Sequence, residues 1–256
     1  MLLFDSMKAK RITLTLTGMV LATSPVVLAV SCGAEKEGKF NLPVVNSWKD
    51  KLTTTNQNLW FEAKITHWTD GDTVSFRPTD AHGTAIADGK TSLRIQNIDS
   101  PEVNHNFAGS VAVDATEEFW GQKSKELGEK LIPVGSRVKI WSVGSFSYNR
   151  LVGSIFYGPE YKNYAIEQLA AGLSLPIMSI NTAFNPANIN SFLLEEAANA
   201  FNNALINKVG LHSLGQAKLE EVLSAHGVKS WNELLYSKRS EGGNVYSLLN
   251  AMKEGN

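Results

Sequence analysis

Alternating apolar and polar positions mark three stretches of the chain, and a period of two residues is the pattern of a half-buried β-strand. The stretches are L-W-F-E-A-K-I-T-H-W at 59–68, T-V-S-F-R-P at 73–78 and S-L-R-I-Q-N-I at 92–98. In the last of these, Leu93 and Ile95 face one way and Arg94 faces the other. The residues from Asp80 to Lys90 are rich in Asp, Gly and Ala, so we expect a loop or hairpin tip there.

A helical spacing of three to four residues replaces this alternation farther along the chain. It predicts a helix over 116–131, and Asp114 and Glu117 before and within it are spaced like a cap and its reciprocal partner. Two more strands are expected after this helix, at 136–143 and 151–157.

The second half of the chain is predicted to be mainly helical. Asn163 is expected to cap a helix that stops near Gly172, because glycine commonly ends helices. A surface loop at 174–191 follows. The next helix is amphipathic, with its apolar face on Leu194, Ala198, Phe201 and Leu205. A helical C-terminal extension is expected at 214–256.

This order of elements predicts a mainly β protein with helices, of the α+β class. Five short strands with inserted helices are compatible with a small Greek-key barrel such as the OB-fold, whose faces and loops often bind oligonucleotides. The expected architecture is therefore a five-stranded barrel with three helices at 59–213, plus the extension.

The N-terminus has the pattern of an export signal. Lys8, Lys10 and Arg11 precede an uncharged apolar run at 12–30, and the only cysteine, Cys32, follows it. The sequence L-A-V-S-C resembles a bacterial lipoprotein box, which implies a signal peptide at 1–31, lipidation of Cys32 and a location on the outer face of the cell membrane. An uncleaved membrane anchor is the alternative, since a spanning helix needs about 20 residues. The polar residues 32–58 are expected to form a tether.

Charge limits how the chain can bind nucleic acid. Without Asp5, Lys8, Lys10 and Arg11, the 24 basic and 25 acidic side chains become 21 and 24, so the mature chain is slightly acidic. Attraction of a polyanion must then come from local cations or from a metal. The five histidines show no zinc spacing, and there is no glycine-rich phosphate loop or serine nucleophile motif.

Two expected strands are bordered by acidic residues. T-D-G-D-T-V places Asp70 and Asp72 at a tight turn before one strand, and R-I-Q-N-I-D-S-P-E ends another with Asp99 and Glu102. Pro101 removes a backbone donor, so we expect the strand to stop and to leave these acids outside the ladder. If the strands are neighbours, the carboxylates meet, and a hard cation such as Ca²⁺ relieves their repulsion. The alternative is that the acids cap turns on opposite sides of the protein.

Two arginines add to this acidic group. Arg94 interrupts an apolar strand and Arg150 opens a later one, although each by itself is typical of a surface ion pair. Together with the carboxylates they form a set suited to phosphodiester cleavage, because guanidinium groups and a metal neutralise charge on phosphate oxygens.

These motifs, D-G-D-T-V, then R-x-x-x-x-D-S-P-E, then Y-N-R, resemble the thermonuclease family, also called staphylococcal-nuclease-like, over 59–213. The resemblance implies an OB-fold barrel and Ca²⁺ bound by Asp72, Asp99 and the carbonyl of Ser100, where the family usually has threonine. It implies Glu102 as the general base. The family roles of the remaining residues are phosphate binding by Arg94 and Arg150 and tuning of the metal by Asp70.

The expected function is therefore an extracellular, membrane-anchored, calcium-dependent nuclease. Such an enzyme hydrolyses DNA and RNA without sequence preference, for instance to scavenge nucleotides. The rival from another class is a non-catalytic OB-fold surface lipoprotein that binds nucleic acid or a host partner.

Overall fold

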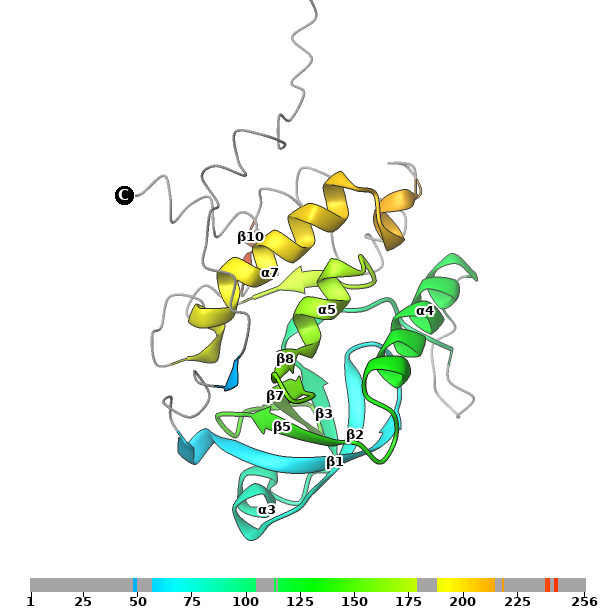
Figure 1. Cartoon of the computed structure of the whole chain (residues 1–256). Helices are drawn as coiled ribbons and strands as arrows, with labels where there is room; N and C mark the ends of the chain where they lie inside the picture. Colours follow the sequence, from blue (N-terminus) through cyan, green and yellow to red (C-terminus); the bar gives the residue numbers. More distant parts are fainter. Residues whose placement is uncertain are drawn as a thin grey trace, which may run out of the picture. The chain divides into compact units, whose positions relative to one another are not determined.

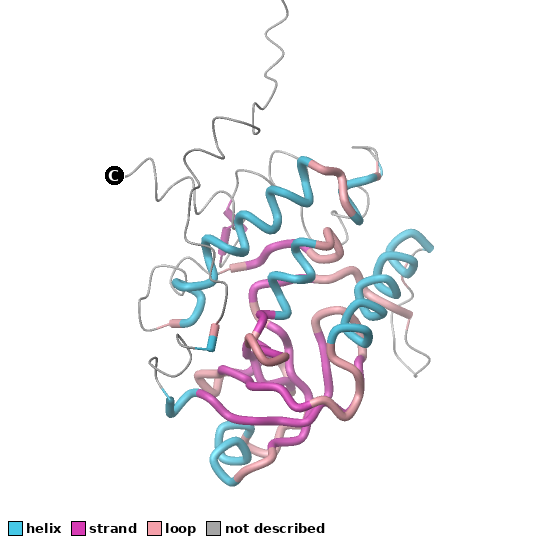
Figure 2. Tube along the Cα trace, in the orientation of Figure 1, coloured by secondary structure: helices cyan, strands magenta, loops and turns pink. Residues whose placement is uncertain are grey.

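Strands form the centre of the structure and helices pack around them (Figures 1 and 2). This computed structural model describes residues 48–49, 57–104, 113, 115–178, 188–214, 218, 238–239 and 242–243. The elements are η1 (Gln57–Leu59), β1 (Trp60–Trp68), β2 (Thr73–Pro78), α3 (Ala81–Ala87), β3 (Ser92–Ile95), β4 (Asn97–Asp99), α4 (Ala115–Leu131), β5 (Arg137–Trp141), β6 (Phe146–Ser147), β7 (Arg150–Tyr157), β8 (Lys162–Asn163), α5 (Tyr164–Ala170), β9 (Leu175–Ile177), α7 (Ile189–Ile206), η2 (Gly210–Ser213), β10 (Lys238–Arg239) and β11 (Gly242–Gly243).

Several sequence predictions fall outside the described residues. These are the signal peptide at 1–31 with Cys32, most of the tether at 32–58, and the helix cap Asp114. In the predicted C-terminal helical extension the structure describes one antiparallel strand pair, β10 with β11, and most of the remaining extension lies outside the described part. No helix in the described part of the chain is long and apolar enough to cross a membrane.

Five strands close into a barrel in the order β3-β2-β1-β5-β7, and β3 pairs with β7 in parallel to complete it. The other four pairings in the barrel are antiparallel. The predicted α+β class and the five-stranded barrel are thus confirmed, and the barrel is compatible with an OB-like one. Alternate residues of each strand point inward: Ile65, Val74, Leu93, Ile140 and Ile155 are all fully buried.

Helices α4, α5 and α7 pack on one another and on the barrel, and α3 (Ala81–Ala87) contacts β1 and β2. Helix α4 contacts β1 and α5, and α5 contacts β7 and α7, so α5 lies between the barrel and α7 (Figure 1). As predicted, Asn163 caps α5: its side chain accepts a 3.2 Å hydrogen bond from the Ile166 N–H. A second apolar cluster includes Trp48, a residue of the segment predicted as a tether. Trp48 packs on Phe156 at a ring distance of 5.6 Å.

The expected loop at Asp80 to Lys90 contains a helix, which corrects the prediction. Asp80 caps α3 by accepting a 2.6 Å hydrogen bond from the Gly83 N–H. Gly83 fits because a Cβ there would lie 2.8 Å from the Phe61 ring. The structure therefore describes four α-helices with assigned bounds, one more than the three expected for 59–213.

The strand predicted at 92–98 is divided into β3 and β4. Asn97, the first residue of β4, has a φ of 75°, a left-handed conformation that asparagine tolerates better than most residues, and the chain changes direction there. Beyond the break, β4 leaves the barrel and pairs with β9, which lies in the predicted loop 174–191. The sequence predicted that Asp99 lies outside any strand ladder. This prediction is wrong, because Asp99 pairs with Leu175 at the end of the ladder between β4 and β9.

His212 in η2 gives a prediction about stability. It is 5% exposed, packs on the Phe201 ring, and neither ring nitrogen has a hydrogen-bond partner in the described part of the chain. Burial lowers the pKa of His212 to about 4. The unfolded chain therefore binds a proton that the folded chain excludes between pH 6.5 and 4. We expect this histidine to remove up to about 3 kcal/mol of stability as the pH falls through this window.

The measurement is urea unfolding at a series of pH values. His212→Leu should flatten the dependence of stability on pH between 6.5 and 4, and His82→Leu on the exposed side of α3 is the control. An unchanged slope in His212→Leu contradicts the prediction.

Candidate active site

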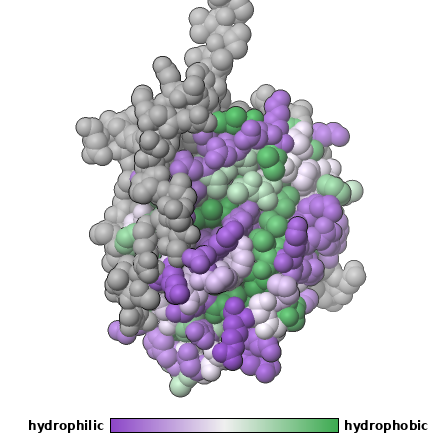
Figure 3. Space-filling view, viewed as in Figure 1, coloured by the Kyte–Doolittle hydropathy of each residue, from purple (hydrophilic) through white to green (hydrophobic). Residues whose placement is uncertain are grey.

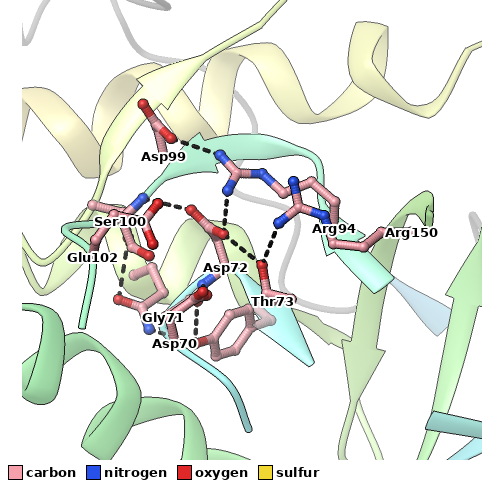
Figure 4. Close-up of polar contacts among 12 residues, drawn as sticks. Asp70, Gly71, Asp72, Thr73, Arg94, Asp99, Ser100, Glu102 and Arg150 are labelled. Carbon is pink, nitrogen blue, oxygen red and sulfur yellow. Dashed lines mark hydrogen bonds and ion pairs between the residues drawn. The ribbon is translucent and has the colours of Figure 1, made fainter. Parts of the chain in front are cut away.

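The side chains singled out by sequence lie together at one edge of the barrel (Figure 4). Asp70 and Asp72 come from the turn between β1 and β2, Arg94 from β3, and Arg150 from the start of β7. Asp99 ends β4, and Ser100 follows it directly. The alternative that Asp72 and Asp99 occupy opposite sides of the protein is therefore wrong.

Asp72 is the centre of this cluster. It is 1% exposed, and both of its carboxylate oxygens accept hydrogen bonds. Oδ1 accepts from Arg94 Nη1 and, at 3.0 Å, from the Thr73 hydroxyl. Oδ2 accepts from the backbone N–H of Ser100 at 2.7 Å. This last bond ties the loop after β4 to the turn after β1, so Asp72 fixes the relative position of two segments of the site.

Arg94 connects the two carboxylates that the sequence proposed as metal ligands. Its Nη1 pairs with Asp72, and its Nη2 donates to Asp99 Oδ1 at 2.6 Å. Figure 4 shows the guanidinium group between the two acids. A planar guanidinium presents several donors in a fixed geometry, so one side chain can serve both acids.

Arg150 reaches the same cluster through Thr73. Its Nη1 donates a 3.0 Å hydrogen bond to the Thr73 hydroxyl oxygen, which itself donates to Asp72. The two guanidinium groups thus point toward the same region (Figure 4). Two arginines therefore lie at this acidic centre, Arg94 bonded to both acids and Arg150 bonded to Thr73.

Glu102 is held near the cluster by close packing of α4. Its backbone N–H donates a 3.3 Å hydrogen bond to Glu117 Oε1. A Cβ at Gly121 would lie 2.2 Å from the Glu102 carbonyl oxygen, so only glycine permits this approach of helix and loop. The Glu102 charge is close enough to Asp70 to raise the pKa of that carboxyl, in addition to the larger effect of burial.

Burial dominates the electrostatics of the turn. It raises the pKa of Asp72 to about 7, against the opposing charge of Arg94 and together with the like charge of Asp70. Burial lowers the pKa of Arg94, but its two carboxylate partners outweigh burial and the net change is a rise. The carboxylates at the turn are thus buried close to one another, and Arg94 supplies the positive charge that opposes the rise in their pKa.

The donor chemistry of the cluster fits a hard cation. Asp72, Asp99 and the Ser100 carbonyl supply the oxygen ligands that Ca²⁺ prefers. In the described residues no group of three or more His, Cys, Asp or Glu side chains is already set as a metal site. The carboxylates of Asp72 and Asp99 meet on the Arg94 guanidinium instead.

A buried polar network under the D-G-D turn was not foreseen from the sequence. The Asp70 carboxylate accepts a 2.9 Å hydrogen bond from the Asp72 N–H, and the Tyr164 hydroxyl donates at 2.8 Å to the Gly71 carbonyl. Gln168 donates to the Tyr164 oxygen and to the Ser124 carbonyl. The network therefore joins α4 and α5 to the turn that carries both aspartates.

Thr73 was also missed as a site residue, although it lies within the motif. Its hydroxyl links Arg150 to Asp72. Its position beside Asp72 in D-G-D-T-V was the available sequence signal. Tyr164 and Gln168 gave none, because they lie more than 90 residues from the turn and a spacing of four on a helix is typical of core packing.

Tyr164→Phe tests the network. The change leaves the Gly71 carbonyl without its buried donor, so we expect a loss of about 1–3 kcal/mol in the free energy of unfolding. Urea denaturation measures it, and Tyr161→Phe is the control because no side-chain hydrogen bond of Tyr161 is recorded within the described segments. Equal stability of Tyr164→Phe and the unsubstituted chain contradicts a supporting role for this hydroxyl.

Fold and site together define an α+β protein with an OB-like barrel and a buried cluster of acids and arginines at one barrel edge. No protein-family profile matches the chain. It is similar to the uncharacterized lipoprotein MG186 of Mycoplasma genitalium, with 28% identity over 240 residues covering 86% of each chain. It is also 27% identical over 281 residues to the MG186 homolog of Mycoplasma pneumoniae, covering 89% of each.

Proposed function

We propose that the chain is a phosphodiester hydrolase of the thermonuclease type that cleaves DNA and RNA without sequence preference. The observation that carries this proposal is the bonded cluster of Asp72, Arg94, Asp99, Thr73 and Arg150, with Glu102 held beside it. It combines acids, which attract a cation and accept a proton, with two guanidinium groups, which bind phosphate.

Each side chain has a distinct role in the proposed reaction. Arg94 and Arg150 bind the scissile phosphate and neutralise charge that develops on its oxygens. Glu102 accepts a proton from the attacking water. The water oxygen bonds to phosphorus as the bond to the 5′-oxygen breaks, so the products carry a 3′-phosphate and a 5′-hydroxyl. Asp72 orients Arg94 through their ion pair.

Calcium is proposed as the cofactor. Asp72, Asp99 and the Ser100 carbonyl are the residues suited to hold it, with Asp70 supporting Asp72 through the 2.9 Å bond to its N–H. Bound Ca²⁺ supplies additional positive charge for the phosphate oxygens. Arg94 neutralises the same two acids when no other cation is present.

The proposed location is the outer face of the cell membrane, through a lipid on Cys32. Both relatives are named lipoproteins, and the L-A-V-S-C sequence at 28–32 has the form of a lipidation signal. A nuclease in this position would digest external nucleic acid and supply nucleotides to the cell.

The test is incubation of the full-length protein, purified in detergent, with plasmid DNA and with RNA in calcium and in excess chelator. We expect nicking and degradation in calcium and none in chelator. Binding of the plasmid without nicking at any calcium concentration contradicts a nuclease and favours the non-catalytic surface lipoprotein.

A further inference from the structure

Three cations form a row across the outer face of the barrel. Lys64 on β1 is directly opposite Arg77 on β2 and directly opposite Arg137 on β5. Residues opposite each other in antiparallel strands point to the same face. All three are exposed, whereas Ala63 and Ile65 on either side of Lys64 are fully buried. We call Arg77, Lys64 and Arg137 the cationic row.

The fold itself gains little from this row. Like charges directly opposite each other destabilise a strand pair. No carboxylate forms an ion pair with any member of the row within the described segments of the chain. A bound polyanion would remove the repulsion between these cations.

A cavity of about 240 Å³ adjoins the row. Its lining includes Arg137 and Lys139 from β5, the two tyrosines Tyr157 and Tyr161, and one acid, Glu62, which lies opposite Lys139. Lys139 Nζ lies 5.0 Å from the centre of the Tyr161 ring. Positive charge beside aromatic surface is the combination that holds nucleotides, because phosphates pair with cations and bases stack on rings. We call this space the tyrosine cavity.

The row and the cavity are separate from the candidate active site but within reach of it. Lys64 precedes Trp68, the last residue of β1, by four positions. With a rise of about 3.4 Å per residue, the row is roughly 14 Å from the end of the strand, and the turn that carries the aspartates begins just beyond that end. Figure 3 shows hydrophilic residues mixed with paler ones over the lower part of the view, where β1 and α3 lie in Figure 1.

We propose that the cationic row and the tyrosine cavity form a second binding surface for a single polynucleotide strand, with phosphates along Arg77, Lys64 and Arg137 and a base in the cavity. The identity of the ligand rests on the proposed nuclease function, since the strand held here is the substrate. An anionic bilayer is the rival occupant. A cavity lined by aromatic rings favours the polynucleotide, because a flat lipid surface cannot enter it.

The test compares two triple variants of the full-length chain. One replaces Lys64, Arg77 and Arg137 with Gln, and the control replaces with Gln three exposed lysines away from the row, Lys123 and Lys130 on α4 and Lys208 in the turn after α7. Both carry Glu102→Gln and are kept in chelator to prevent cleavage. Fluorescence anisotropy with a labelled 20-nucleotide single-stranded DNA is recorded over a series of salt concentrations.

We expect the row variant to bind at least tenfold more weakly than the control, with the slope of log affinity against log salt smaller by about 2, because three phosphate contacts are lost. Tyr161→Ala should weaken binding by about tenfold without changing that slope. Equal affinity and slope in the two triple variants overturn the proposal. The proposal is also overturned if the row variant loses binding to phosphatidylglycerol vesicles but still binds DNA like the control. Row-dependent DNA binding in a protein that never cleaves supports this surface while refuting the nuclease.

Discussion

Glu102→Gln is expected to lower the rate of phosphodiester cleavage by about 10²–10⁴-fold, the range typical for loss of a general base. Glutamine has nearly the same shape but cannot accept the proton of the attacking water. The position of residue 102 should persist, because its backbone N–H bond to Glu117 and its packing against Gly121 do not depend on the carboxylate. The loss should therefore appear in kcat, with KM little changed.

Steady-state kinetics on a short oligonucleotide in calcium give this measurement. Glu129→Gln, on the exposed side of α4, is the matched control and should keep full activity. Thermal unfolding of both variants tests whether the fold is intact. Full activity in a folded Glu102→Gln variant contradicts the assigned role.

Substitution of Arg94 should affect both stability and activity. Arg94→Ala removes the cation shared by Asp72 and Asp99, and Asp72 is 1% exposed. We expect a loss of about 3 kcal/mol in the free energy of unfolding in the absence of calcium, at the low end for a broken buried pair because the Arg94 side chain keeps 18% exposure.

Arg94→Lys distinguishes the effect of the positive charge at residue 94 from the effect of the planar guanidinium geometry. Lysine keeps the positive charge but lacks the planar fork that serves two acids at once. The stability loss should be smaller than for alanine, whereas cleavage should still fall by about 10²–10³-fold, the scale of one lost transition-state contact.

Urea unfolding and steady-state kinetics measure these two effects, with Lys208→Ala as the control at an exposed position. An Arg94→Ala variant as stable as the unsubstituted chain would show that the ion pairs contribute nothing. A fully active Arg94→Lys variant would exclude bidentate binding as a requirement for cleavage.

The elements that the sequence predicted well are those whose periodic pattern is long. Strands β1 and β2 largely alternate over their nine and six residues, and α4 continues for 17. Such patterns are decided locally, because one face of the element must be buried. The capping role of Asn163 was equally local, since a cap depends on residues three positions away.

The missed elements are short and depend on distant partners. Strands β4 and β9 have three residues each, and Asp99 pairs with Leu175 far along the chain. Pro176 inside β9 argued against a strand, since proline donates no ladder hydrogen bond. The seven-residue helix α3 contains Gly83, and glycine is a weak helix former. A larger residue does not fit at this position, because its Cβ would lie 2.8 Å from the Phe61 ring.

The sequence predicted most of the residues of the candidate site, but not the hydrogen bonds and ion pairs between them. The spacing of the acids and the resemblance to thermonucleases identified Asp72, Arg94 and Asp99. That Arg94 would bridge the two acids depends on the turn at Asn97, which no local pattern revealed. The support of the turn by Tyr164 depends on tertiary packing of α5.

The most direct measurement is the fate of a 5′-labelled oligonucleotide incubated in calcium with the full-length protein and, in parallel, with Glu102→Gln prepared in the same way. We predict multiple-turnover cleavage by the former to products that end in a 3′-phosphate, and a loss of at least 100-fold in the variant, as expected for a missing general base. No cleavage by either protein, or equal cleavage by both, would contradict a phosphodiesterase site built from these residues.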